Sequence, residues 1–147
     1  LHGVSMGAAT VLMASGEELP ENVKAIIADC GYTSEWDEFK CEANALHIPW
    51  FPVLNAASVM SRLRDGYDFK QASALEKVKQ SRIPTLFIHG SDDELVPYSM
   101  LDKLYSAAVC KKECLTVNGA GHALSSSVEP ELYWNTVENF IEKYLEK

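Results

Sequence analysis

The feature that most constrains this chain is an alternation between short apolar runs and longer amphipathic segments. The runs 23–28, 83–89 and 113–117 are short and largely apolar, which is typical of strands covered on both faces. Helices are expected between and after them, at about 97–109 and 130–143, each starting with a proline that a first helical turn tolerates. Strands that alternate with helices predict an α/β fold, with a parallel sheet flanked by helices.

The segment 32–82 interrupts this alternation. It is too long for one crossover helix, and it is rich in aromatic residues and prolines. We expect two helices and a connecting loop that form a cap-like excursion, at about 33–80, above the ends of the strands. No internal repeat or domain boundary is visible, so the sequence predicts a single domain over 1–147.

Composition narrows the classes of function. A chain of 147 residues, 47% of them hydrophobic, suits one globular domain. Its formal net charge of −8 argues against nucleic acid and anionic membranes as partners. No apolar run is long enough to span a bilayer and no signal peptide is visible, so we expect a cytoplasmic protein. The cysteines lack C-x-x-C spacing and are interpreted as free thiols: Cys30, Cys41, Cys110 and Cys114.

The sequence GVSMG, residues 3–7, places Ser5 between two glycines just before a helix of small residues expected at 6–14. A serine hydroxyl is a poor nucleophile unless it is exposed and lies next to a base. A sharp turn before a helix exposes the hydroxyl, and the glycines allow neighbouring backbone to approach closely. Since only Leu1 precedes His2, the sequence predicts no strand before this turn within the chain.

Two further loops follow the later apolar runs. HGSDDELVP, residues 89–97, carries adjacent acids, and NGAGH, residues 118–122, ends on a histidine. Serine, then aspartate, then histidine, each after a strand, is the chain order of one kind of hydrolase triad. Because the carboxyl ends of parallel strands share one edge of the sheet, the three side chains are expected to converge there.

With GVSMG, HGSDDELVP and GAGH, together with ADCGYTS and GYDF, the chain resembles the alpha/beta-hydrolase superfamily. It is most similar there to serine aminopeptidase-like and prolyl-oligopeptidase-like bacterial hydrolases. The resemblance implies the C-terminal half of that fold, N-terminally truncated, with the first strands and the loop that donates a second oxyanion amide lying outside this chain.

The resemblance also implies roles for individual residues. Ser5 would be the nucleophile, His122 the base, Asp93 the acid, and the Met6 N–H one donor of the oxyanion hole. The implied activity is that of a serine hydrolase, which cleaves an ester, thioester or amide bond in a small molecule or peptide without a cofactor. A catalytically incompetent fragment, and a binding or acyltransferase member of the fold, are the alternatives.

Three aspartates are candidates for the acid. Asp93 is followed by two residues and then Val-Pro, as in similar hydrolases, whereas Asp92 is not. Asp92 is interpreted as a loop cap or a solvent-facing residue. Asp29, at the end of the run 23–28, is a rival because some hydrolases take their acid from that place, but a structural contact to the loop at Gly31 is preferred.

His2 and His89 are interpreted as structural residues. The histidines show neither H-x-x-x-H nor H-E-x-x-H spacing, so we expect no catalytic metal.

Aromatic residues offer candidates for a substrate pocket. Trp36, Trp50 and Phe51 could line an apolar pocket, or they could seal the excursion onto the core, and the sequence leaves both readings open. Trp134, in the last expected helix, is predicted to be a core residue.

The run 23–28 is also expected to form an edge strand, because the strands that would cover it are not in this chain. An apolar edge presents unpaired backbone groups to any matching strand. We therefore expect the chain to form a homo-oligomer or to pair with the missing N-terminal segment.

Overall fold

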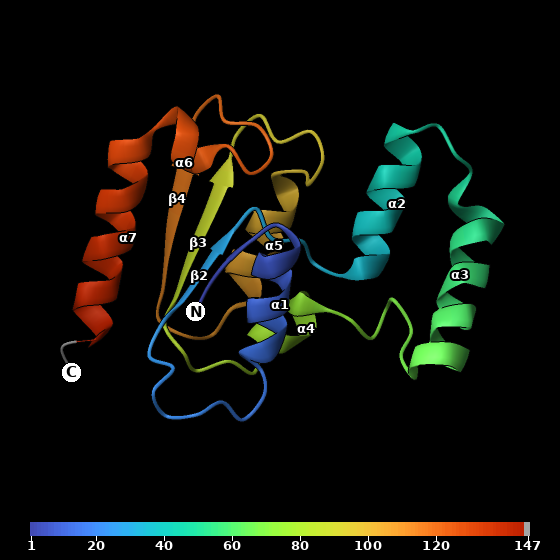
Figure 1. The fold of residues 1–147 in the computed structure, drawn as a ribbon, viewed down its shortest axis with the longest axis horizontal. Coiled ribbons are helices and arrows are strands. Elements are labelled where there is room, and N and C mark those ends of the chain that lie inside the picture. The colour runs from blue at the N-terminus through green and yellow to red at the C-terminus, as the bar shows by residue number, and fades with distance from the viewer. Residues whose placement is uncertain (146–147) are drawn as a thin grey trace.

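The computed structural model describes residues 1–145 and has four parallel strands in the order β1-β2-β3-β4. The strands are β1 (His2–Val4), β2 (Ile26–Asp29), β3 (Thr85–Gly90) and β4 (Lys112–Val117). Helix α7 covers one face of the sheet, and α1, α4 and α5 lie on the other (Figure 1). The predicted α/β class with a parallel sheet is confirmed.

The helices agree with the sequence pattern in most places. They are α1 (Met6–Ala14), α2 (Glu35–Ala45), α3 (Trp50–Asp65), α4 (Ala74–Val78), α5 (Ser99–Ala107), α6 (Ser125–Val128) and α7 (Pro130–Leu145). The excursion does contain two main helices, α2 and α3, which stand to one side of the sheet (Figure 1).

Strand β1 corrects two expectations. A strand does precede the turn at Ser5, and it pairs with β2 from His2↔Ile27 to Val4↔Asp29. The run 23–28 is therefore not an edge, and β1 is the edge instead. The three residues of β1 form a strand because their backbone N–H and C=O groups can pair with β2 and are then not left unsatisfied.

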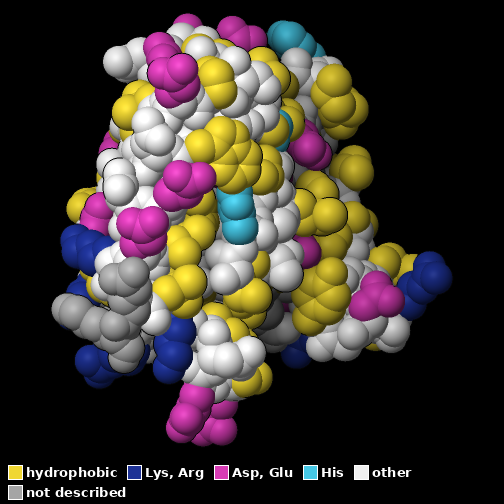
Figure 2. Space-filling model, turned by 60° about the vertical axis from the view of Figure 1, so that its left-hand side comes forward, with side chains coloured by type: hydrophobic (Ala, Val, Ile, Leu, Met, Phe, Trp, Pro, Cys, Tyr) yellow, Lys and Arg dark blue, Asp and Glu magenta, His cyan; other side chains and the backbone are white. Residues whose placement is uncertain are grey.

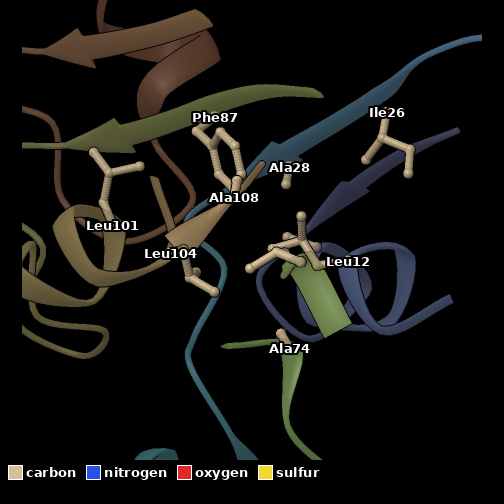
Figure 3. Packing of buried hydrophobic residues seen from close by; sticks show 10 residues of the cluster. Leu12, Ile26, Ala28, Ala74, Phe87, Leu101, Leu104 and Ala108 are labelled. Carbon is tan, nitrogen blue, oxygen red and sulfur yellow. The ribbon is translucent and has the colours of Figure 1, made fainter. Parts of the chain in front are cut away.

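The core has a layer on each face of the sheet. On one face, Phe87 of β3 packs with Leu12 of α1 and Leu104 of α5, with Ala74 of α4 in the same cluster (Figure 3). Residues of β2 and β3 that point the opposite way pack against α7; this second cluster includes Ile27, Leu86, Ile88, Tyr133, Val137 and Phe140. Each fully buried side chain of this size contributes about 2 kcal/mol, so both layers hold the strand ends in place.

Trp134 is not a core residue, contrary to the prediction. Its side chain is 48% exposed, because the neighbouring Tyr133 already occupies the buried side of α7. Successive residues of an α-helix are rotated by about 100° about the helix axis, so Trp134 points away from the side that Tyr133 occupies. Trp134 and His2 border a hollow of about 370 Å³ beside β1, on a side where hydrophobic side chains gather (Figure 2).

Within residues 1–145, no helix combines the length and the apolar character that a membrane crossing requires.

Candidate active site

Ser5 lies at the turn between β1 and α1 in an unusual backbone conformation. Its φ of 54° and ψ of −116° lie in a region that non-glycine residues rarely adopt. The turn is held by a hydrogen bond of 2.8 Å from the Ser5 N–H to the carbonyl of Asp29. Gly3 is required here, since a Cβ on it would lie 2.2 Å from the carbonyl oxygen of Gly7. The Ser5 hydroxyl does not cap α1 and is free for another partner.

His122 connects Ser5 to Asp93. Its Nε2 lies 2.8 Å from Oγ of Ser5, and its Nδ1 lies 2.9 Å from Oδ2 of Asp93. With the proton on Nδ1, the ring donates to the Asp93 carboxylate and accepts from the serine hydroxyl, so both bonds are satisfied at once. The structure thus brings together the three side chains that the sequence pattern predicted would converge.

Asp93 is held as a buried carboxylate. Its Oδ1 accepts the backbone N–H groups of Leu95 at 3.0 Å and Val96 at 2.9 Å, and its Oδ2 faces two histidines. Burial acts to raise the pKa of Asp93, but hydrogen bonds from His89, His122 and Val96 outweigh it and leave this pKa below its ordinary value. The carboxylate therefore stays ionised at neutral pH and can stabilise a protonated His122.

His89 contacts Asp93 directly, whereas the sequence pattern indicated only a structural residue there. Its ring is fully buried, with Nε2 2.9 Å from the Val96 carbonyl oxygen and 3.3 Å from Oδ2 of Asp93. Its Nδ1 is buried and has no hydrogen-bond partner among residues 1–145, so the tautomer with the proton on Nε2 leaves no donor unpaired. The available sequence signal was its place at the end of β3, four residues before Asp93.

The other two aspartates point elsewhere. Asp92 is exposed and accepts a hydrogen bond of 2.6 Å from the Ser91 hydroxyl. Asp29 is buried and accepts a hydrogen bond of 3.2 Å from Ser125 and a further one from Tyr133, so its carboxyl group contacts α6 and α7 rather than the loop at Gly31. Burial raises the pKa of Asp29 in spite of these two hydrogen bonds.

Cys30 lies close enough to suggest a metal site. Ligand atoms of Cys30, Asp93 and His122 all lie within 4.8 Å of one another, the one such group in the part of the chain described. Burial, together with the nearby Asp29 charge, raises the pKa of Cys30 to about 12, so its thiol stays protonated. Since a metal requires the thiolate, and Asp93 and His122 already bond each other, this donor set does not fit a metal.

A cavity of about 170 Å³ opens beside Ser5. Met6 borders it and is the first residue of α1, where helical N–H groups lack intrahelical partners. The remaining lining comes from the loop before α2, from α2 and from the acid loop: Tyr32, Glu35, Glu38, Phe39, Glu42 and Leu95. The cavity thus lies beside the Ser5 hydroxyl, to which His122 is hydrogen-bonded, and beside the N-terminal end of α1.

The comparison with known families agrees with this fold. The model of the prolyl oligopeptidase family matches residues 1–147. The chain belongs to this family. It is accordingly an alpha/beta hydrolase, as the sequence resemblance implied.

Relatives of this prolyl oligopeptidase family member include bacterial and vertebrate proteins. The chain is 30% identical over 143 residues to the uncharacterized protein YqkD of Bacillus subtilis (strain 168), covering 97% of this chain and 47% of that protein. It is 30% identical over 106 residues to the human alpha/beta hydrolase domain-containing protein 17C, covering 70% of this chain and 32% of that protein. The chain thus spans less than half the length of these curated relatives.

Solved structures share the fold. The Pyrococcus furiosus esterase Pf2001 has a TM-score of 0.70 at 18% identity, covering 97% of this chain and 53% of the esterase. The Pyrococcus horikoshii acylaminoacyl peptidase has a TM-score of 0.67 at 18% identity, covering 99% of this chain and 24% of the peptidase.

The three predicted pocket aromatics do not reach the cavity beside Ser5 in this prolyl oligopeptidase family member. Trp36 and Trp50 pack edge to face with ring centroids 6.4 Å apart, and each borders a separate hollow. Phe51 packs against Trp50 and is 65% exposed. The aromatic residues that do reach the cavity are Tyr32 and Phe39, and Phe39 also borders the apolar groove of Trp50.

Proposed function

We propose that the chain carries the catalytic residues of a serine hydrolase that cleaves an ester, thioester or amide bond through an acyl-enzyme. Ser5 is the nucleophile, His122 the general base and Asp93 the orienting acid. The observation that carries this proposal is the position of His122, hydrogen-bonded to Ser5 at 2.8 Å and to Asp93 at 2.9 Å. The family match supports hydrolase activity in general.

In the first half of the proposed reaction, Oγ of Ser5 attacks the carbonyl carbon while Nε2 of His122 takes the hydroxyl proton. The tetrahedral intermediate collapses, and His122 returns that proton to the leaving alcohol, thiol or amine. In the second half, His122 deprotonates a water that attacks the acyl-enzyme, which releases the acid and restores Ser5. Asp93 holds the imidazole tautomer and balances its positive charge throughout.

The oxyanion requires hydrogen-bond donors aimed at the developing charge. We assign one of them to the Met6 N–H, because it follows the nucleophile and begins α1, where the helix dipole favours negative charge. A donor of this kind typically contributes about 3 kcal/mol to transition-state stabilisation.

At the level of the whole protein, we propose one hydrolase domain, with residues 33–80 as a helical cap and a small molecule or peptide as substrate. The cap assignment follows from α2 and α3, which stand together beside the sheet, and from α2, which borders the Ser5 cavity through Phe39 (Figure 1). The hollow beside β1 is the proposed site of pairing with another strand.

Burst kinetics test the proposed function. The complete natural polypeptide containing these residues should release one equivalent of p-nitrophenol from p-nitrophenyl butyrate before the steady state. Mass spectrometry of the quenched protein should then show a butyryl adduct. Turnover without any adduct, or an adduct that survives replacement of Ser5, would contradict an acyl-enzyme at this serine.

A further inference from the structure

The cavity beside Ser5 has an acidic wall that ester or amide hydrolysis does not require. Glu35, Glu38 and Glu42 of α2 all border it. They are spaced three and four residues apart, so they share one face of the helix. Negative charge near a developing oxyanion is unfavourable by Coulomb's law, and the wall must therefore be explained by something other than the bond-breaking step.

Glu38 is the most constrained of the three. Its side chain is buried, with 7% exposure, and its Oε2 has no hydrogen-bond partner among residues 1–145. A buried acceptor without a partner is costly. Burial, with Glu42 and Asp93 nearby, also raises the pKa of Glu38 to about 7. A bound group that brings both hydrogen-bond donors and positive charge would remove both costs.

Cations of the described chain do not supply this group. Lys40, the one lysine of α2, lies with Nζ 4.8 Å from the ring centroid of Trp50. None of the ion pairs found within residues 1–145 involves the three glutamates. Asp37 of the same helix accepts hydrogen bonds from Thr33 and Ser34 and has a structural role. Glu35 is hydrogen-bonded by the neutral hydroxyl of Tyr67, which brings no positive charge.

The spacing of the wall favours an organic cation over a metal ion. In the part of the chain described, three potential ligand atoms come within 4.8 Å of one another only at Cys30, Asp93 and His122. The three glutamates do not form such a group among the described residues. An ammonium or guanidinium group has several N–H donors and can reach separate carboxylates.

We propose that this cavity selects substrates whose acyl part carries a primary ammonium or a guanidinium group, bound by Glu38 with Glu35 and Glu42. The assignment rests on the proposed hydrolase function, since it orients the acyl part relative to Ser5. Phe39 and Leu95, which also border the cavity, provide apolar contacts for the methylene groups between the cation and the carbonyl.

A matched pair of substrates tests this assignment on the complete natural polypeptide. Nα-benzyloxycarbonyl-lysine p-nitrophenyl ester and its norleucine analogue differ in the terminal ammonium. We expect kcat/KM to be at least about tenfold higher for the lysine ester. Glu38→Gln and, separately, Glu35→Gln should lower this ratio at least about fivefold, mainly through KM for the lysine ester. Glu138→Gln, which removes one charge from the exposed side of α7, should leave the ratio unchanged.

Direct binding separates this proposal from the hydrolase proposal. Calorimetry should detect hexylammonium but not 1-hexanol, with the ammonium signal lost in Glu38→Gln. Equal kcat/KM values for the two esters, or a ratio unaffected by both glutamine variants, would overturn the cation site and leave the hydrolase intact. If hexylammonium binds in a Glu38-dependent way but neither ester is turned over, the hydrolase proposal is overturned and the cation site is kept. Glu38-dependent binding of Mg²⁺ in place of hexylammonium would also overturn the assignment.

Discussion

Nε2 of His89 lies 3.3 Å from Oδ2 of Asp93, with both side chains completely buried. Because His89 also bonds the Val96 carbonyl at 2.9 Å, it ties the end of β3 to the loop that carries the acid. The same carboxylate oxygen that bonds His122 is thus held from a second side. In the proposed mechanism, His89 would act through Asp93 as a positioning residue.

Replacing His89 should therefore weaken catalysis without removing it. His89→Phe should lower kcat about 10-fold to 100-fold with a smaller change in KM, since Asp93 loses a hydrogen bond but stays buried. His89→Gln, which restores a donor, should recover part of the loss. The acidic limb of the kcat/KM profile should move to higher pH in His89→Phe, because this hydrogen bond lowers the pKa of Asp93. An unmoved pH profile would limit His89 to a packing role.

Asp93→Asn should reduce kcat by about 10⁴-fold, the loss expected when the orienting acid becomes an amide. Asp92 and Asp29 provide the controls. Asp92→Asn should be nearly silent, because its recorded bond is to the exposed Ser91. Asp29→Asn changes a buried residue at the end of β2 and should act mainly on stability. A larger loss of kcat in either control would assign the acid elsewhere.

Glu38 predicts an unusual dependence of stability on pH. Its pKa in the folded protein, about 7, lies above its ordinary value of 4.5, so ionisation is less favourable in the folded state. The free energy of unfolding should therefore fall as pH rises from about 4.5 to above 7. Glu38→Gln removes this titration, and it should be more stable than the native protein by about 2 kcal/mol at pH 8 and nearly equal at pH 5. Urea unfolding at the two pH values measures this difference, and a variant that is less stable at pH 8 would contradict it.

A polypeptide of these 147 residues should not remain monomeric. Strand β1 is one of the two edges of the sheet, and the hollow beside it is bordered by Trp134, which is 48% exposed. An unpaired edge next to an apolar hollow favours association with a matching strand. Size exclusion with light scattering should show a dimer or larger species. A monodisperse monomer that melts cooperatively would be the contrary result.

The convergence of Ser5, Asp93 and His122 could be anticipated because parallel strands end at a common edge, whatever fills the intervals. The directions in which the side chains of α2 and α3 point could not be anticipated. The pattern of α2 and α3 indicates helices, but their rotation depends on how they pack together, so Phe39 and the glutamates face the cavity in place of Trp36 and Trp50. The contact of His89 with Asp93 was missed for a similar reason, since it depends on how the acid loop folds back on β3.

Labelling with a fluorophosphonate tests the central claim most directly, because the reagent reacts covalently with an activated serine. The complete natural polypeptide should gain one adduct, and peptide mapping should place it on Ser5. Ser5→Ala should abolish the adduct, while Ser91→Ala, which removes an exposed hydroxyl from the acid loop, should retain it. Labelling that persists unchanged in Ser5→Ala would contradict the assignment of Ser5 as the nucleophile.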